Sequence, residues 1–130
     1  MVPDEGERIA AELRRWADDT KVNLILTTGG TVMTTRDVTP EATLAVLERQ
    51  ASGFAEAMRA GSAAKTPHAM LSRAVSGIRG HTLIINMPGS PSACREQFAM
   101  IAPALAHAVE KLLDLGGDCA MPEPQRAPEG

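Results

Sequence analysis

Aromatic residues are nearly missing from this sequence of 130 residues, which contains no Tyr, one Trp and two Phe. Proteins that bind single-stranded nucleic acid stack bases on aromatic side chains, so few platforms of that kind are available here. Basic residues are not in excess either, because 13 Lys and Arg stand against 16 Asp and Glu, for a net charge of −3. The composition therefore excludes a basic footprint for nucleic acid and a polybasic membrane patch.

Long apolar runs and metal-ligand motifs are also absent. No segment approaches the ~20 apolar residues that span a bilayer, and the acidic start Met-Val-Pro-Asp-Glu-Gly-Glu is not typical of a signal peptide. The two cysteines, Cys94 and Cys119, have no metal-ligand spacing, and we expect them to be reduced thiols. These absences predict a cytoplasmic protein without nucleic-acid or membrane partners.

Two short apolar runs, Val22–Thr27 and Thr82–Met87, are typical of strands covered on both faces. We expect Ser76–His81 to be a glycine-punctuated turn and Lys65–Ala74 to be a short helix or turn. Apolar residues at helical spacing predict four helices: Glu5–Asp18, one that starts at Thr39, one with Phe54 and Met58, and Ser92–Leu115. The alternation predicts an α/β fold with a mostly parallel sheet flanked by helices.

A single domain accounts for most of the chain, since 130 residues fit one domain. We place this domain at residues 1–115. Gly116 and Gly117 end the last predicted helix, and three Pro lie among mixed polar residues after them. Residues 116–130 are therefore expected to form a disordered C-terminal tail.

The most informative segment, residues 24–43, has the sequence LILTTGGTVMTTRDVTPEAT. A strand runs directly into Thr28, Gly29, Gly30 and Thr31. Glycine allows positive φ and close approach, so that successive N–H groups can gather around an anion, and Thr hydroxyls add donors. The same residues are also compatible with an ordinary tight turn.

A second turn, at Gly89 and Ser90, follows the other apolar run. Ser90 can cap the last helix with Pro91 as its first residue. Ligands of such sheets bind outside the carboxyl ends of the strands. Because both glycine turns follow strands, we expect both to open onto the same edge of the sheet.

Arg36 and Asp37 lie between the first turn and the helix start at Thr39, a residue expected to cap that helix. One interpretation is a surface ion pair, which contributes ~0–1 kcal/mol. In the other, Arg36 clamps a phosphate while Asp37 holds a magnesium ion or accepts hydrogen bonds from the donor edge of a ligand. The pattern leaves these alternatives open.

Three further positions carry weaker signals. Asp4, with Glu7 three residues later, is typical of a helix cap. Ser72 and Arg73 place a hydroxyl and a guanidinium beside a turn, which is a weak phosphate motif. The three histidines have no carboxylate or cysteine at ligand spacing, so we expect them to be surface or satisfied side chains: His68, His81 and His107.

Several blocks taken together resemble a known family. The blocks TTGGT, RDVTPEAT, LSR, GIRG, TLIIN and PGSP occur here in the order of the molybdenum-cofactor biosynthesis domain family, which includes molybdopterin adenylyltransferases and the N-terminal domain of gephyrin. The resemblance covers about Val2–Leu113 and implies the three-layer fold of molybdopterin-binding domains. It also implies an enzyme that adenylylates molybdopterin with ATP and Mg²⁺ and releases pyrophosphate. A non-catalytic pterin-binding or scaffold module is the alternative.

The same resemblance implies roles for individual residues. Asp37 and Asp4 match catalytic aspartates, and Asp37 is the candidate magnesium ligand. The substrate or nucleotide contacts implied are Thr28, Gly29, Gly30, Thr31, Arg36, Ser72, Arg73, Gly89 and Ser90. Family members are commonly homotrimers, which is the assembly expected here.

The sequence departs from the family pattern in two ways. Val32 stands where the family usually has glycine, and a β-branched residue resists positive φ and adds bulk. Family members also usually have a strand, a helix and a second strand before the Val-Pro-Asp block, which here starts at Val2. Relative to the family, we therefore expect an N-terminally truncated domain.

Overall fold

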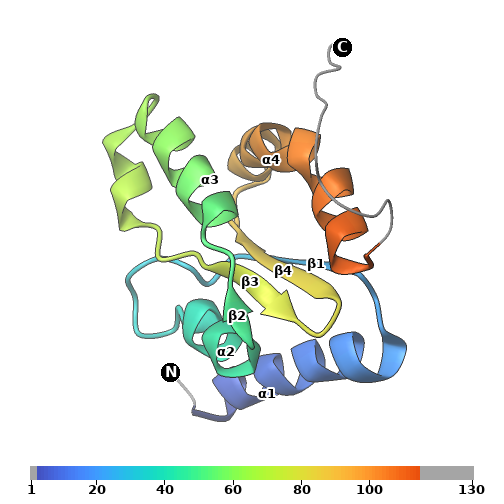
Figure 1. Ribbon diagram of the computed structural model, residues 1–130. Coiled ribbons are helices and arrows are strands. Elements are labelled where there is room, and N and C mark those ends of the chain that lie inside the picture. Colours follow the sequence, from blue (N-terminus) through green and yellow to red (C-terminus); the bar gives the residue numbers. More distant parts are fainter. Residues whose placement is uncertain (1–2, 115–130) are drawn as a thin grey trace.

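The computed structural model describes residues 3–114, with side chains from residue 5 onward (Figure 1). The predicted tail and the helix end at Gly116 and Gly117 lie outside the described residues. The elements in chain order are α1 (Pro3–Arg14), η1 (Arg15–Thr20), β1 (Leu24–Thr28), α2 (Thr39–Val46), β2 (Arg49–Gln50), α3 (Gly53–Ala63), η2 (Pro67–Leu71), β3 (Ser76–Arg79), β4 (Thr82–Met87) and α4 (Pro91–Leu112).

The four strands form one sheet in the order β1-β4-β3-β2. β1 pairs with β4 in parallel, with Leu26 opposite Ile85. β3 is antiparallel to both β4 and β2. The predicted α/β fold with a helix-flanked sheet is confirmed, but the sheet is mixed instead of mostly parallel.

The difference arises at Ser76–His81, which we expected to be a turn. Its first part is β3, and only Gly80 and His81 turn the chain into β4. Gly77 lies inside this strand, where a Cβ atom would come within 2.4 Å of Leu47 Cδ1 and 2.6 Å of the Arg49 carbonyl oxygen. Glycine is thus present because the segment with Leu47 and Arg49 approaches the strand closely, and not because the chain turns at this residue.

Helices cover both faces of the sheet, as the three-layer fold requires. Figure 1 shows α1 and α2 on one face and α3 and α4 on the other. Alternate residues of β4 serve the two layers: Ile84 packs with α1 and α2, whereas Leu83 and Ile85 pack with α3 and α4. None of the described helices is long and apolar enough to cross a bilayer.

The helix ends confirm one predicted cap and correct two. Ser90 caps α4, since its hydroxyl accepts a hydrogen bond from the Ala93 N–H at 3.4 Å. Thr39 is not the cap of α2 but its first residue, and its N–H donates to the Gly30 carbonyl oxygen at 3.1 Å. Because that tertiary bond already satisfies the first donor of the helix, no side-chain cap is needed. α1 begins at Pro3, so Asp4 lies inside its first turn.

A buried asparagine joins the layers close to the carboxyl ends of β1 and β4. The Asn86 amide nitrogen donates to the hydroxyls of Thr27 on β1 and Thr43 on α2, at 2.9 and 3.0 Å. Its amide oxygen accepts from the Val75 N–H at 3.1 Å. With its side chain fully enclosed, Asn86 fixes the end of the sheet at which the glycine turns lie.

Candidate functional site

The two glycine turns meet at one edge of the sheet, as the sequence predicted. The Gly29 N–H donates to the carbonyl oxygen of Met87, the last residue of β4, at 3.0 Å. A Cβ atom on Gly89 would lie only 3.2 Å from the Gly29 Cα. Gly29 and Gly30 both have positive φ, 83° and 69°. Glycine is therefore required here by conformation and by close contact together.

A pocket of about 670 Å³ lies in front of these turns. The predicted site residues that line it are Gly29, Gly30, Thr31, Ser72, Gly89 and Ser90. Helix α4, 22 residues long, begins at this pocket, so the positive end of its dipole faces the pocket. Among the described residues, no group accepts a hydrogen bond from the backbone N–H of Gly30 or Gly89, which leaves both donors available.

Besides His68, five polar side chains in this pocket were not predicted from the sequence: Ser62, Lys65, Thr66, Glu96 and Gln97. Lys65 Nζ and Glu96 Oε2 form an ion pair at 3.4 Å. The Gln97 amide nitrogen donates to the Ser62 hydroxyl at 2.9 Å and joins α3 to α4. The available signal was the position of Glu96 and Gln97 one to two turns after the Ser90 cap. His68 also lines the pocket and is exposed, as expected of a surface histidine.

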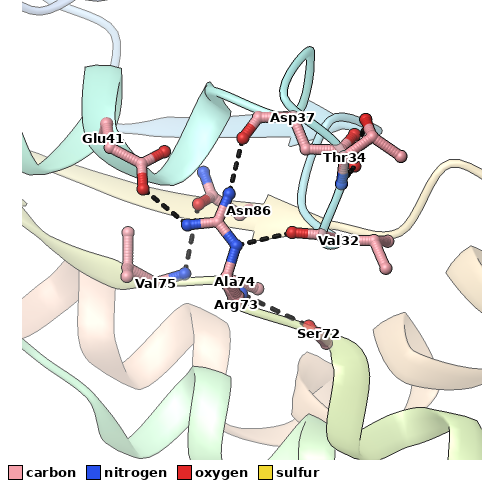
Figure 2. Close-up of polar contacts among 9 residues, drawn as sticks. All are labelled: Val32, Thr34, Asp37, Glu41, Ser72, Arg73, Ala74, Val75 and Asn86. Atoms are coloured by element: carbon pink, nitrogen blue, oxygen red, sulfur yellow. Dashed lines mark hydrogen bonds and ion pairs between the residues drawn. The ribbon is translucent and has the colours of Figure 1, made fainter.

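Arg73 holds the loop after the first glycine turn in place (Figure 2). Its Nε donates to the Val32 carbonyl oxygen and its Nη2 to the Asp37 carbonyl oxygen, each at 2.5 Å. Its Nη1 pairs with the Glu41 carboxylate, and its backbone N–H donates to the Thr31 carbonyl oxygen at 2.7 Å. Arg73 does not line the pocket, but it fixes the loop that forms one wall.

Asp37 closes a tight turn within that loop. One of its carboxylate oxygens accepts from the Thr34 N–H at 2.8 Å and from the Thr34 hydroxyl at 2.9 Å. These two bonds, the backbone bond first, hold the pKa of Asp37 below its ordinary value. The carboxylate is therefore ionised at neutral pH and only partly buried.

The remaining predicted residues lie apart from the pocket lining. Thr28 and Arg36 are exposed, and no described residue hydrogen bonds or ion-pairs with the Arg36 side chain. The alternative of an Arg36–Asp37 ion pair is therefore not what the structure shows. The Asp4 side chain lies outside the described residues.

The residues present are compatible with magnesium bound together with substrate. Within residues 3–114, no group of three or more His, Cys, Asp or Glu side chains could hold a metal ion. Mg²⁺ often uses only one or two carboxylates and completes its shell with substrate phosphates and water. The ionised Asp37 suits that arrangement.

Val32 fits the loop without strain. Lys21 and Asp114 are the non-glycine residues with positive φ in the described part of the chain, so Val32 is not among them. Val32 is 42% exposed and lines the pocket. The loop thus accommodates valine in an ordinary backbone conformation, and the bulk of its side chain is what distinguishes it from glycine.

Comparison with known proteins identifies the family of this chain. A family model described as a probable molybdopterin binding domain matches residues 1–107. Gephyrin of Dictyostelium discoideum is 46% identical over 127 residues, which make up 98% of this chain and 17% of that protein. A molybdopterin adenylyltransferase of Escherichia coli (strain K12) is 43% identical over 109 residues, 84% of this chain and 56% of the relative. The chain thus spans less than two thirds of these curated relatives.

Solved structures show the same fold. The molybdopterin biosynthesis enzyme MoaB from Thermus thermophilus matches with a TM-score of 0.78 at 50% identity, covering 84% of this chain and 69% of that one. The Mog protein from Mycobacterium ulcerans matches with a TM-score of 0.77 at 39% identity, covering 82% and 69%. From the family match, the identities and the shared fold, this chain belongs to the molybdopterin-binding domain family.

Proposed function

We propose that this chain acts in molybdenum cofactor biosynthesis, where it adenylylates molybdopterin with ATP and Mg²⁺ and releases pyrophosphate. The observation that carries the proposal is the convergence of two glycine turns and the N-terminus of α4 on one pocket. Such an arrangement gathers backbone N–H donors and a helix dipole around phosphate groups. Relatives named molybdopterin adenylyltransferase, 42–48% identical to this chain, support the choice of reaction.

Both reactants of this reaction are anions, so the protein has to align them and neutralise their charge. The terminal phosphate of molybdopterin attacks the α-phosphorus of ATP, and the bond to the departing pyrophosphate breaks. The N–H groups of Gly30 and Gly89 donate to phosphate oxygens. No covalent nucleophile is needed, which suits a pocket lined by backbone donors and hydroxyls.

The loop after the first turn supplies the charged groups. Asp37 would hold the magnesium ion, whose charge would offset that of the phosphates. Arg36, exposed on the same loop, is the guanidinium that would bind a phosphate oxygen in this proposal. Arg73 keeps this loop in place through the carbonyl groups of Val32 and Asp37. Asp4 belongs to the proposed site through the family resemblance alone.

The test is product formation by residues 1–130 with molybdopterin, ATP and Mg²⁺. Mass spectrometry should detect adenylylated molybdopterin, and pyrophosphate should appear in equal amount. The same domain preceded by a family-type N-terminal segment is the comparison. If both proteins fold and neither forms the adenylylated product, the enzyme assignment is wrong.

A pterin-binding or scaffold module is the second candidate, and Val32 is the observation that favours it, since its side chain adds bulk to the pocket wall. This candidate predicts retention of molybdopterin without product. Substitution Val32→Gly distinguishes the two: product that appears only in this variant indicates that the valine blocks catalysis. Equal turnover by both proteins removes the argument for the scaffold.

We also infer a homotrimer for this domain. Met33 and Met70, 61% and 72% exposed, provide apolar surface next to the pocket for such an assembly. Sedimentation velocity should give three times the chain mass of 13.7 kDa. A mass of one chain at micromolar concentration contradicts the inference.

A further inference from the structure

A lysine and a glutamate, both unaccounted for by the reaction above, face each other in the pocket. Lys65 lies just after α3, and Glu96 lies in the second turn of α4. Lys65 Nζ and Glu96 Oε2 are 3.4 Å apart, and the two side chains are 59% and 49% exposed. Both residues line the pocket that the glycine turns open onto.

Hydrogen bonds fix the segments that carry this pair more firmly than the ion pair fixes the two side chains. The Lys65 N–H donates to the Ser62 carbonyl oxygen at 2.9 Å. The Ser62 hydroxyl, in a residue that is 8% exposed, accepts from the Gln97 amide at 2.9 Å. The backbone on either side of the pair is thereby tied together, while the Lys65 side chain remains a flexible stem with a mobile charge.

A carboxylate in a pocket for polyanions needs an explanation, because like charges repel. Glu96 is tolerated because Lys65 neutralises it. A half-exposed ion pair contributes little to stability and is separated at small cost. A phosphate group carries more charge than a carboxylate and accepts several charge-assisted hydrogen bonds. Phosphate is therefore the stronger partner for Lys65 wherever both are within its reach.

We infer that Lys65 exchanges its partner when substrate enters, leaving Glu96 and binding a substrate phosphate. Glu96 acts as a resident counter-ion that keeps the lysine over the pocket and competes with the ligand. The inference rests on the proposed function for the identity of the substrate, and it assigns a specificity-determining role to two residues outside the glycine turns. The phosphate belongs either to ATP or to molybdopterin.

The test is a double-mutant cycle on residues 1–130, with pyrophosphate as the calorimetric probe. Lys65→Met should weaken pyrophosphate binding about tenfold, the loss expected for one charged hydrogen bond. Glu96→Gln should tighten binding about threefold, because the competitor is removed. The double variant should still bind several-fold more weakly than the wild type. Arg95→Met is the matched control, since it removes a positive charge from an exposed residue of α4 that does not line the pocket.

The double variant decides between exchange and simple neutralisation. If Lys65 does no more than neutralise Glu96, removing both charges restores wild-type affinity, and the inference is wrong. It is equally wrong if Lys65→Met and Arg95→Met bind pyrophosphate alike, or if the wild type binds none. Enzyme kinetics then identify the source of the phosphate, because only the KM for the substrate that Lys65 contacts should rise. If the protein forms no product but shows this binding pattern, the inference about Lys65 holds and the proposed reaction is wrong.

Discussion

Gly29 and Gly89 approach each other so closely that a Cβ atom on Gly89 would lie 3.2 Å from the Gly29 Cα. They follow β1 and β4, which are parallel neighbours in the sheet. This contact places two turns that are far apart in the sequence side by side in the lining of one pocket. It is the structural reason why the backbone donors of both turns can act on the same ligand.

Substitution Gly30→Ala should destabilise the fold by about 1–3 kcal/mol, because a side chain must adopt a left-handed conformation there. The new Cβ atom would also lie 2.4 Å from the Thr39 hydroxyl oxygen. Gly53→Ala is the control, since a Cβ atom on Gly53, the first residue of α3, would have no heavy atom within 4 Å. Urea denaturation should show the difference, and equal midpoints would refute the role of Gly30.

Arg73→Met should lower the free energy of unfolding by about 2–3 kcal/mol, because the guanidinium of Arg73 donates hydrogen bonds to two carbonyl groups and one carboxylate. Arg73→Lys keeps the charge but cannot span the three acceptors, so it should recover little of that loss. Hydrogen exchange of the amides at residues 31–37 reports the loop directly. If Arg73→Lys protects these amides as well as the wild type does, charge alone holds the loop.

The ion pair between Glu41 and Arg73 should make stability depend on pH. The hydrogen bond from Arg73 holds the pKa of Glu41 below its ordinary value of 4.5 in the folded protein. The stabilisation is therefore present above that value and is lost as pH falls through the lower folded pKa. The Tm of wild type should exceed that of Glu41→Gln at pH 7, and this difference should shrink as the pH is lowered below 4.5 through the folded pKa of Glu41.

The same comparison in an Arg73→Met background is the control for Glu41. Without the guanidinium, the Tm difference caused by Glu41→Gln should disappear at pH 7 as well. A difference that persists there would show that Glu41 acts through another partner.

Asp37→Asn separates the two roles of this side chain. The amide oxygen can still accept both bonds from Thr34, so the turn and the Tm should change little. The lost charge should lower kcat about a hundredfold or more, as expected when one electrostatic partner of the transition state is removed. Asp37→Ala should lose the turn as well. Full turnover by the Asn variant would exclude Asp37 from catalysis.

Features set by short stretches of sequence could be predicted. β1, β4 and the cap at Ser90 each follow from a run of a few residues. Gly77 was misinterpreted because its need for space comes from Leu47 and Arg49 of another segment. The cap predicted at Thr39 failed for the same reason, since a carbonyl from the glycine turn already satisfies that helix start.

The same distinction, between features set by short stretches of sequence and features set by distant segments, applies to the candidate site. The place of the two glycine turns could be predicted because each turn directly follows an apolar run that predicts a strand. The pair formed by Lys65 and Glu96 brings together the turn after α3 and the helix α4, and no local pattern indicates that they meet. The position of Arg73 behind the loop, instead of in the pocket, likewise depends on where its acceptors fold.

The most direct test of the central claim is amide chemical-shift mapping of residues 1–130 during titration with ATP and Mg²⁺. If the paired turns bind phosphate, the largest shifts should fall on Gly29, Gly30, Gly89 and Ser90. The opposite end of β4 carries another pocket, of about 470 Å³, lined by residues that include Arg49 and His81. Shifts concentrated there, with the glycine turns unchanged, would contradict the assignment of the site.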